Sequence, residues 1–92
     1  MPGGYRFVID FDGERLRATP VERQPAAVVS VGPGPDAAEL LDQHVVKNPA
    51  TGGWRVSFQL QPKSSQPIEL RAFLTEGSDV LTETWSYVLL PE

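Results

Sequence analysis

Cysteine is absent from this 92-residue chain, which excludes disulfides, thiol nucleophiles and thiolate metal ligands together. Long apolar runs are absent as well, and no stretch approaches the roughly 20 residues that a membrane-spanning helix needs. The N-terminus carries neither the basic nor the apolar segment of a signal peptide. We therefore expect no membrane insertion. The lack of cysteine does not determine the cellular compartment, because exported bacterial domains often do without disulfides.

Concentrated positive charge is also missing. The net charge is −4, whereas a nucleic-acid-binding protein gathers basic residues on one face to neutralise phosphates. Acidic residues interrupt the strongest basic cluster, which consists of Arg15, Arg17 and Arg23. The composition therefore argues against a nucleic-acid partner.

Turn-forming residues are abundant instead, with nine prolines and eight glycines spread along the chain. Hydrophobic residues make up 40% of the chain and charged residues 22%, an ordinary globular balance. This combination is typical of a protein of short strands and many turns. We expect residues 1–4 to be a short leader and residues 5–92 to form a single domain.

Period-two alternation of apolar and polar residues predicts several half-buried strands. It is clearest over residues 54–60 and recurs over residues 5–11. Asp12-Gly13 is a hairpin signal after the first strand. Further strands are expected within residues 14–18, 26–31, 68–74 and 80–90, separated by polar or proline-rich segments.

Residues 36–44 are ambiguous between a helix and a strand. Asp36 suits a helix N-cap, Glu39 stands three positions later, and the residues around them are good helix formers. Propensity is a weak determinant that a sandwich crossover can override. One or two helical turns and a strand are therefore equally compatible with this segment, with Val45 and Val46 as the remnant of a strand.

About seven short strands at intervals of 8–12 residues predict an all-β, immunoglobulin-like sandwich. A short helical turn near residues 36–44 would be its only helix. The cysteine–tryptophan–cysteine core of antibody domains is missing, so the likeness concerns architecture alone.

Metal-binding or nucleophilic chemistry has little support in the sequence. Asp10, Asp12 and Glu14 could ligate a hard cation, but a turn at Asp12-Gly13 explains this pattern and the other positions of a calcium loop are unmatched. His44 is the only histidine, and no nucleophile motif accompanies it. We expect no metal and no cofactor.

General acid–base chemistry would need two carboxylates across a cleft. The candidate pairs are Asp36 with Glu39, and Glu69 with Glu83. A sandwich of this size is filled by its own side chains and offers little room for such a cleft. We therefore expect no catalytic residue.

Trp54, Trp85 and Tyr87 are the candidates for carbohydrate binding, because exposed aromatic faces can stack on pyranose rings. Trp85 and Tyr87 lie on the same side of a predicted strand, and that side also carries Leu81 and Leu89. Such an apolar side favours core packing. Contact with a neighbouring domain and carbohydrate binding are the alternatives.

Four stretches of the chain, in order, resemble a known family: residues 6–11, 48–56, 68–74 and 81–87. The most specific is Asn-Pro-Ala-Thr-Gly-Gly-Trp-Arg, which begins at Asn48. In these stretches the chain resembles the C-terminal domain of the periplasmic glucan biosynthesis proteins G and D. Residues 33–44 carry no likeness.

The resemblance implies an immunoglobulin-like domain of E-set type, the excised C-terminal piece of a larger periplasmic protein of Gram-negative bacteria. That protein would help to make osmoregulated, β-1,2-linked glucans. The glucan-acting residues of the family belong to a large N-terminal domain, so none is carried over to this chain. The implied partners are that N-terminal domain, a membrane glucosyltransferase and β-glucan.

Two functions of different classes follow. The first is a non-catalytic accessory domain that packs on the large glucan-acting domain or docks a partner, which predicts an exposed apolar or polar-rimmed patch. The second is a carbohydrate-binding module for β-glucan, which predicts a solvent-facing aromatic platform with polar groups beside it.

Overall fold

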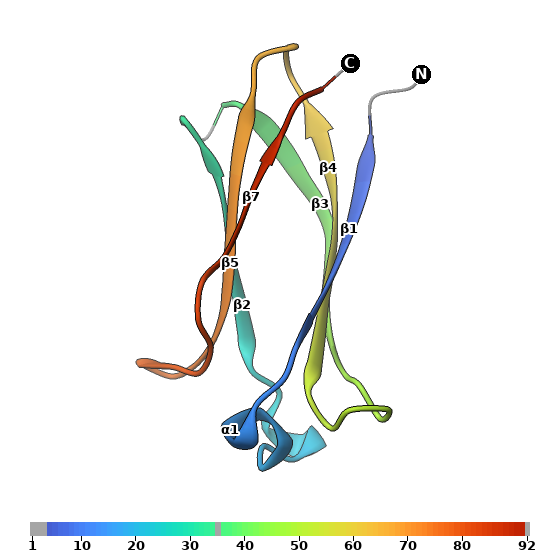
Figure 1. Cartoon of the computed structure of the whole chain (residues 1–92), viewed down its shortest axis with the longest axis vertical. Helices are drawn as coiled ribbons and strands as arrows, with labels where there is room; N and C mark the ends of the chain where they lie inside the picture. The colour runs from blue at the N-terminus through green and yellow to red at the C-terminus, as the bar shows by residue number, and fades with distance from the viewer. Residues whose placement is uncertain (1–3, 35, 92) are drawn as a thin grey trace.

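Two antiparallel β-sheets pack face to face in the computed structural model, which describes residues 4–34 and 36–91 (Figure 1). The first sheet has the order β1-β4-β3, with bounds Tyr5–Phe11, Trp54–Pro62 and Ala38–Lys47. In the second sheet β5 pairs with β2, β6 and β7; β2, β5, β6 and β7 span Ala26–Gly32, Ile68–Glu76, Asp79–Val80 and Trp85–Leu89. The predicted all-β, immunoglobulin-like sandwich is confirmed. Residues 1–3 of the expected leader, Pro35 and Glu92 lie outside the described residues.

The sandwich has two ends of different construction (Figure 1). The upper end holds both described termini and the loops at residues 33–37 and 63–67. The lower end holds helix α1 (Glu14–Arg17), the 3-10 helix η1 (Val21–Arg23), the loop at residues 48–53 and the turn between β5 and β6. Neither helix of the described chain is long or apolar enough to cross a membrane.

Strands β4 and β5 form the centre of the core, because every second side chain of each points between the sheets. These inward side chains are at most 1% exposed: Trp54, Val56, Phe58, Leu60, Ile68, Leu70, Ala72 and Leu74. Burial of apolar surface stabilises the fold by about 25 cal/mol per Å². The alternation predicted over residues 54–60 and 68–74 is therefore confirmed.

The predicted hairpin at Asp12-Gly13 is wrong. Strand β1 pairs with β4 rather than with a returning strand, and residues 14–17 form the single turn of α1. The Asp12 carboxylate accepts the Gly13 N–H at 2.7 Å, and Gly13 has a φ of 142°, which favours glycine. The Glu-Arg-Leu-Arg sequence that follows has high helix propensity. The turn places Leu16, 1% exposed, against the lower end of the core.

The helical alternative for residues 36–44 is also wrong, because β3 covers most of this segment. The strand pairs with β4 from Ala38 to Lys47 and places Ala38 and Leu40 against the core. A bulge between Leu41 and His44, with Asp42 at a φ of 51°, adds one residue to the strand and keeps both halves in register. Ladder bonds and core contacts together outweigh the local helix propensity.

Candidate functional site

Trp54, the first carbohydrate candidate, is a core residue. Its side chain is 1% exposed, and the Lys47 ammonium group lies 5.3 Å from the ring centroid. Within the described residues its Nε1–H has no hydrogen-bond partner. A ring this deeply buried offers no face to a sugar.

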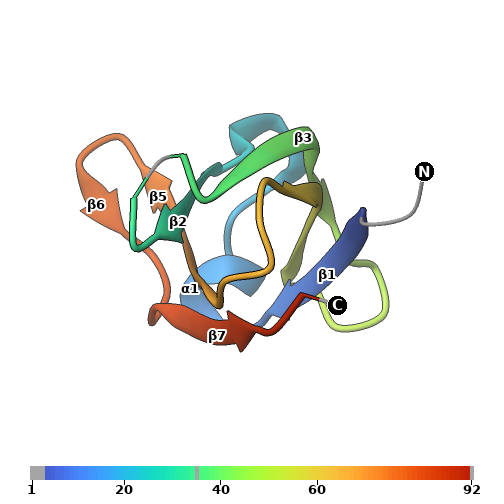
Figure 2. The same ribbon diagram turned by 90° about the horizontal axis from the view of Figure 1, so that it is seen from above.

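Trp85 and Tyr87 lie where the edge strands β1 and β7 run side by side (Figure 2). This side of the sandwich is called the β1–β7 seam below. The two rings are nearly parallel, with centroids 6.0 Å apart and planes at 12°. The Phe7 ring meets Trp85 and Tyr87 edge-on at 6.0 and 5.8 Å. Trp85 is half-buried, and Tyr87 is 49% exposed. The pair is therefore partly core and partly surface.

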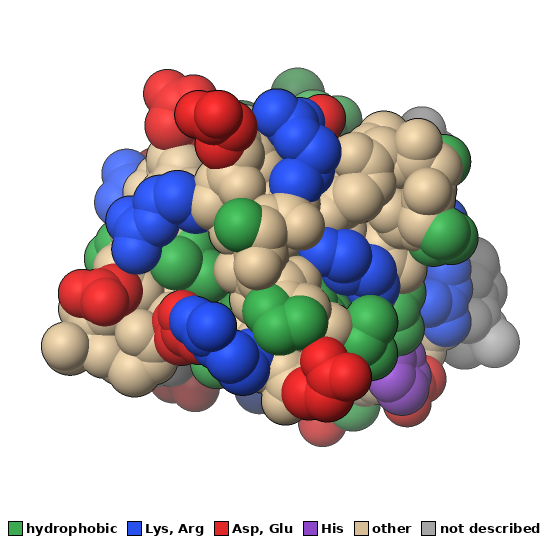
Figure 3. Space-filling view, turned by 90° about the horizontal axis from the view of Figure 1, so that it is seen from below, with side chains coloured by type: hydrophobic (Ala, Val, Ile, Leu, Met, Phe, Trp, Pro, Cys, Tyr) green, Lys and Arg blue, Asp and Glu red, His purple; other side chains and the backbone are tan. Residues whose placement is uncertain are grey.

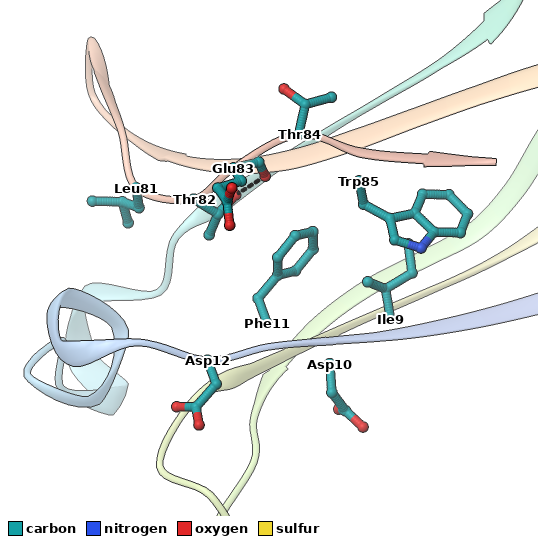
Figure 4. A pocket seen from close by; sticks show the side chains of 9 residues that line it. All are labelled: Ile9, Asp10, Phe11, Asp12, Leu81, Thr82, Glu83, Thr84 and Trp85. Carbon is teal, nitrogen blue, oxygen red and sulfur yellow. Dashed lines mark hydrogen bonds between the residues drawn. The ribbon is translucent and has the colours of Figure 1, made fainter.

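A pocket of about 480 Å³ opens in the lower half of this seam and is called the seam pocket below (Figure 4). Its lining combines aromatic, aliphatic, hydroxyl and carboxylate groups: Ile9, Asp10, Phe11, Asp12, Leu81, Thr82, Glu83, Thr84 and Trp85. Figure 4 shows the Phe11 ring pointing from β1 towards the segment at residues 82–84. Ligand sites combine apolar surface with a few placed polar groups, and this lining contains both kinds.

The seam pocket exists because the chain leaves the sheet between β6 and β7. The Leu81 N–H still donates to the Leu74 carbonyl at 2.8 Å. The Leu74 N–H, however, donates to the Thr82 hydroxyl at 3.1 Å, and that hydroxyl donates to the Glu83 carbonyl at 2.9 Å. The Thr82 hydroxyl thus replaces the backbone carbonyl that a neighbouring strand would offer to Leu74. Residues 82–84 therefore stand away from β5.

The two aspartates on the rim of the pocket are engaged elsewhere. Arg55 donates to both carboxylate oxygens of Asp10, at 2.7 and 3.1 Å, and Asn48 donates to the same group at 3.2 Å. The Arg55 hydrogen bond is the main reason that the pKa of Asp10 lies below its ordinary value. Asp12 accepts from Arg17 at 2.7 Å. Both carboxylates point away from Phe11 and Trp85 in Figure 4, and Glu83 is the third carboxylate of the lining.

The cation hypothesis for Asp10, Asp12 and Glu14 gains no support from this geometry. Residues 4–34 and 36–91 contain no cluster of three metal-ligating side chains. In the described chain Arg55 holds the Asp10 carboxylate and Arg17 holds that of Asp12. Glu14 is exposed in the first turn of α1.

The other chemical candidates are dispersed. Glu69 lies opposite Val88 on β7, whereas Glu83 precedes that strand near the level of Leu74. Five residues of strand, roughly 16 Å, separate the two levels. Glu39 and His44 are exposed on β3, and Asp36 lines a separate pocket at the upper end.

This second pocket, called the end pocket below, has a volume of about 290 Å³. Two loops that are distant in sequence enclose it, and its lining is mostly apolar: Pro33, Gly34, Asp36, Ala37, Ser64, Gln66, Pro67 and Ile68. Residue Leu90, at the same end, is 68% exposed. The loops lack periodicity, so the sequence carries no signal for their meeting.

The fold and its pockets define a small immunoglobulin-like β-sandwich with one pocket at the β1–β7 seam and another at its upper end. The chain matches the family described as periplasmic glucan biosynthesis protein, MdoG, over residues 2–89. It therefore belongs to the periplasmic glucan biosynthesis family.

Several relatives carry the name glucans biosynthesis protein G. The relative from Serratia proteamaculans (strain 568) is 42% identical over 92 residues, covering 95% of this chain and 16% of the relative. The relative from Sodalis glossinidius (strain morsitans) is 40% identical over 88 residues, with the same two shares covered. That from Pectobacterium carotovorum subsp. carotovorum (strain PC1) is 39% identical over 91% of this chain. The chain thus spans about a sixth of the length of these relatives.

Proposed function

We propose that this chain is a non-catalytic accessory domain of a periplasmic glucan biosynthesis protein, and that its upper end packs against the rest of the longer protein. The family and the names of the relatives support the glucan pathway and the periplasm. The small share of each relative that the chain covers supports a role within a larger protein.

The exposed apolar surface at the upper end carries this proposal. Leu90 is 68% exposed, and the end pocket beside the loops is lined by Pro33, Ala37, Pro67 and Ile68. Both described termini lie at this end (Figure 1). Whichever of them continues in a longer protein, the added chain starts beside this surface. Interfaces between domains of one chain are of this mixed, partly apolar kind.

A chimera tests the packing. In it, this chain replaces the matching segment of the Serratia proteamaculans relative, and amide hydrogen exchange is compared with that of the isolated chain. We expect the amides of Gly34, Asp36 and Ala37 and those of residues 63–66 to exchange about tenfold more slowly in the chimera, because packing suppresses local opening. The amides of Asn48 and of residues 50–53, at the lower end, should keep their rates.

Two matched substitutions sharpen this experiment. Leu90→Ser should remove the added protection, whereas Val21→Ser, at a 66% exposed position of the lower end, should leave it unchanged. Added protection at the lower end, or none, would contradict packing through the upper end. If protection requires an added membrane glucosyltransferase, this end docks a partner instead.

The seam pocket favours a second candidate, a carbohydrate-binding module for β-glucan. Phe11 and Trp85 provide ring surfaces for the C–H faces of a sugar, and Glu83 and Thr84 provide polar groups for its hydroxyls. A shallow aromatic pocket with a polar rim is a chemically reasonable site for one glucose unit.

Titration of the isolated chain with linear β-1,2-glucan oligomers tests this candidate. Amide NMR shifts should saturate at Phe11 and at residues 83–85, with no change around Trp54. Glu83→Gln should weaken binding several-fold, and Glu39→Gln, on the exposed side of β3, serves as the matched control. No shift at millimolar oligomer would exclude the seam pocket as a glucan site.

A further inference from the structure

Strand β2 is an edge strand without the usual protection against pairing. It has one sheet neighbour, β5, among the described strands, and its sequence Ala-Ala-Val-Val-Ser-Val-Gly contains no charge and no proline. The edge strand on the same side of the other sheet, β3, is interrupted by the bulge at Asp42. Bulges, charges and prolines are the devices that keep sheet edges from pairing. Strand β2 has none of them.

The direction of the free backbone groups follows from one hydrogen bond. The Gln43 side chain of β3 donates to the Ala27 carbonyl at 3.1 Å, so this carbonyl points away from β5. In an antiparallel strand, the N–H and C=O of one residue point to the same side and alternate along the strand. The N–H and C=O groups of Val29 and Val31 therefore also point outward.

A groove lies along this edge. It has a volume of about 390 Å³ and is lined by Val29, Ser30, Val31, Ala38 and Leu40. The groove lies between the sheets, above the place where Gln43 bridges β3 to β2. Outward backbone groups beside an apolar groove are the features by which an added strand is bound.

We propose that β2 pairs antiparallel with β2 of a second copy of this chain, with the two-fold axis at Ser30. The Val-Ser-Val sequence is symmetric about that residue, so Val29 of each copy meets Val31 of the other. Each such pair can exchange both of its backbone hydrogen bonds. The strand carries no charge, so the two copies meet without repulsion between like charges. The contact between Gln43 and Ala27 stays in place.

This dimer is weak. A contact through one short strand falls below the roughly 1,200 Å² typical of stable interfaces, so we expect a dissociation constant on the order of 0.1–1 mM. NMR relaxation of the isolated chain should give a tumbling time that rises with concentration over this range. The Val29 and Val31 amides should become more protected from exchange as the concentration rises.

Charge substitutions at Ser30 provide the decisive test. Ser30 is exposed and would face its own copy, so Ser30→Lys or Ser30→Glu should weaken the dimer tenfold or more by repulsion. An equimolar mixture of the two variants should restore pairing. The matched controls are Ser86→Lys and Ser86→Glu, because Ser86 lies on the other side of the same neighbour, Arg71. They should associate like the unsubstituted chain.

Three outcomes would overturn the proposal. The first is a tumbling time that stays constant up to about 2 mM, and the second is a dimer that Ser30→Lys does not weaken. The third is failure of the mixed Ser30 variants to associate. Protection of Val29 and Val31 that appears only within a longer glucan biosynthesis protein would assign this edge to another segment of that protein instead. The packing of the upper end is tested separately, since Ser30 lies outside it.

Discussion

Among the described residues, side-chain hydrogen bonds and ion pairs tie the lower end of the sandwich together, whereas the two loops of the upper end meet through a backbone hydrogen bond. At the lower end, Lys47 donates to the Leu16 and Thr19 carbonyls at 3.1 and 2.8 Å, and Arg23 and Glu76 form a two-pronged ion pair across 53 positions of sequence. Figure 3 shows acidic and basic side chains intermingled over this surface. At the upper end, one backbone hydrogen bond of 3.2 Å, from Lys63 to Ala37, joins the two loops.

This difference distinguishes an end that stabilises the fold from an end that offers a surface to a partner. Polar and charged side chains at the lower end form hydrogen bonds and ion pairs with groups of the same end. These contacts stabilise the isolated chain without a partner. At the upper end Leu90 is exposed beside the mostly apolar end pocket, so a covering surface would bury apolar area there. The following substitutions compare matched positions of the two ends, beginning with the largest expected effect.

Leu16→Ala should be the most damaging substitution. Leu16 is 1% exposed and packs against the core from α1, so its truncation leaves a cavity and should cost about 3 kcal/mol of unfolding free energy. Leu90→Ala, at the upper end, should change it by less than about 0.5 kcal/mol in the isolated chain. Urea denaturation followed by tryptophan fluorescence measures both. Equal losses would show that the two ends do not differ in this way.

Gly53→Ala should be the next in size. A Cβ at Gly53 would collide with the carbonyl oxygen of Phe11, and the backbone cannot yield as a flexible side chain would. We expect a loss of about 2 kcal/mol, in the range of overpacked sites. Gly34→Ala is the matched change at the upper end, where an added Cβ meets nothing within 4 Å. It should be neutral or slightly stabilising. Thermal unfolding of the two variants decides between these outcomes.

Lys47→Met tests the polar tie between β3 and α1. The ammonium group donates to the carbonyls of Leu16, Arg17 and Thr19 and lies over the Trp54 ring. Its removal takes a donor from all three carbonyls, of which that of Leu16 still accepts the Thr19 N–H. We expect a loss of about 2 kcal/mol. Lys63→Met, at an exposed position of the upper end, should be within about 0.5 kcal/mol of the unsubstituted chain. A neutral Lys47→Met would show that water replaces the ammonium group.

The sequence predicts the sandwich well where the hydrophobic period is long and regular. Strands β4 and β5 each alternate over seven residues, 54–60 and 68–74, and no other secondary structure places their side chains so consistently on one face. The sequence-based predictions fail where tertiary contacts determine the secondary structure of a segment. Strand β3 is held by its ladder with β4, and α1 is held by Leu16 and Lys47. Neither contact is readable from the local sequence.

The candidate site is less predictable than the fold. The alternation of Trp85 and Tyr87 places both rings on one side of β7, but the exposure of Tyr87 depends on β7 being an edge strand beside β1. The seam pocket depends on Thr82, whose hydroxyl takes a ladder position of β5. Hydrogen bonds between strands of unknown order cannot be derived from residue spacing.

The smallest expected effect is the dependence of the lower end on pH. Hydrogen bonds from Arg55 and Arg23 hold the pKa values of Asp10 and Glu76 below their ordinary values of 3.8 and 4.5. Lowered pKa values in the folded state mean that both pairs contribute stability at and above those ordinary values. The contribution is lost as the pH falls below them and through the folded-state pKa values. The free energy of unfolding should therefore decline below about pH 4.5.

Urea denaturation between pH 6 and pH 3 measures this decline, and substitutions assign it. The double variant with Asp10→Asn and Glu76→Gln should lose less stability over this interval than the unsubstituted chain, because the groups that titrate are gone. Glu39→Gln, which removes an exposed carboxylate of β3, should keep the full decline. Both ion pairs are exposed and thus screened by solvent, so the effect should shrink further at high salt. If the double variant retains the full decline, the decline arises from other titrating groups. The two ion pairs of the lower end would then contribute nothing measurable to the free energy of unfolding.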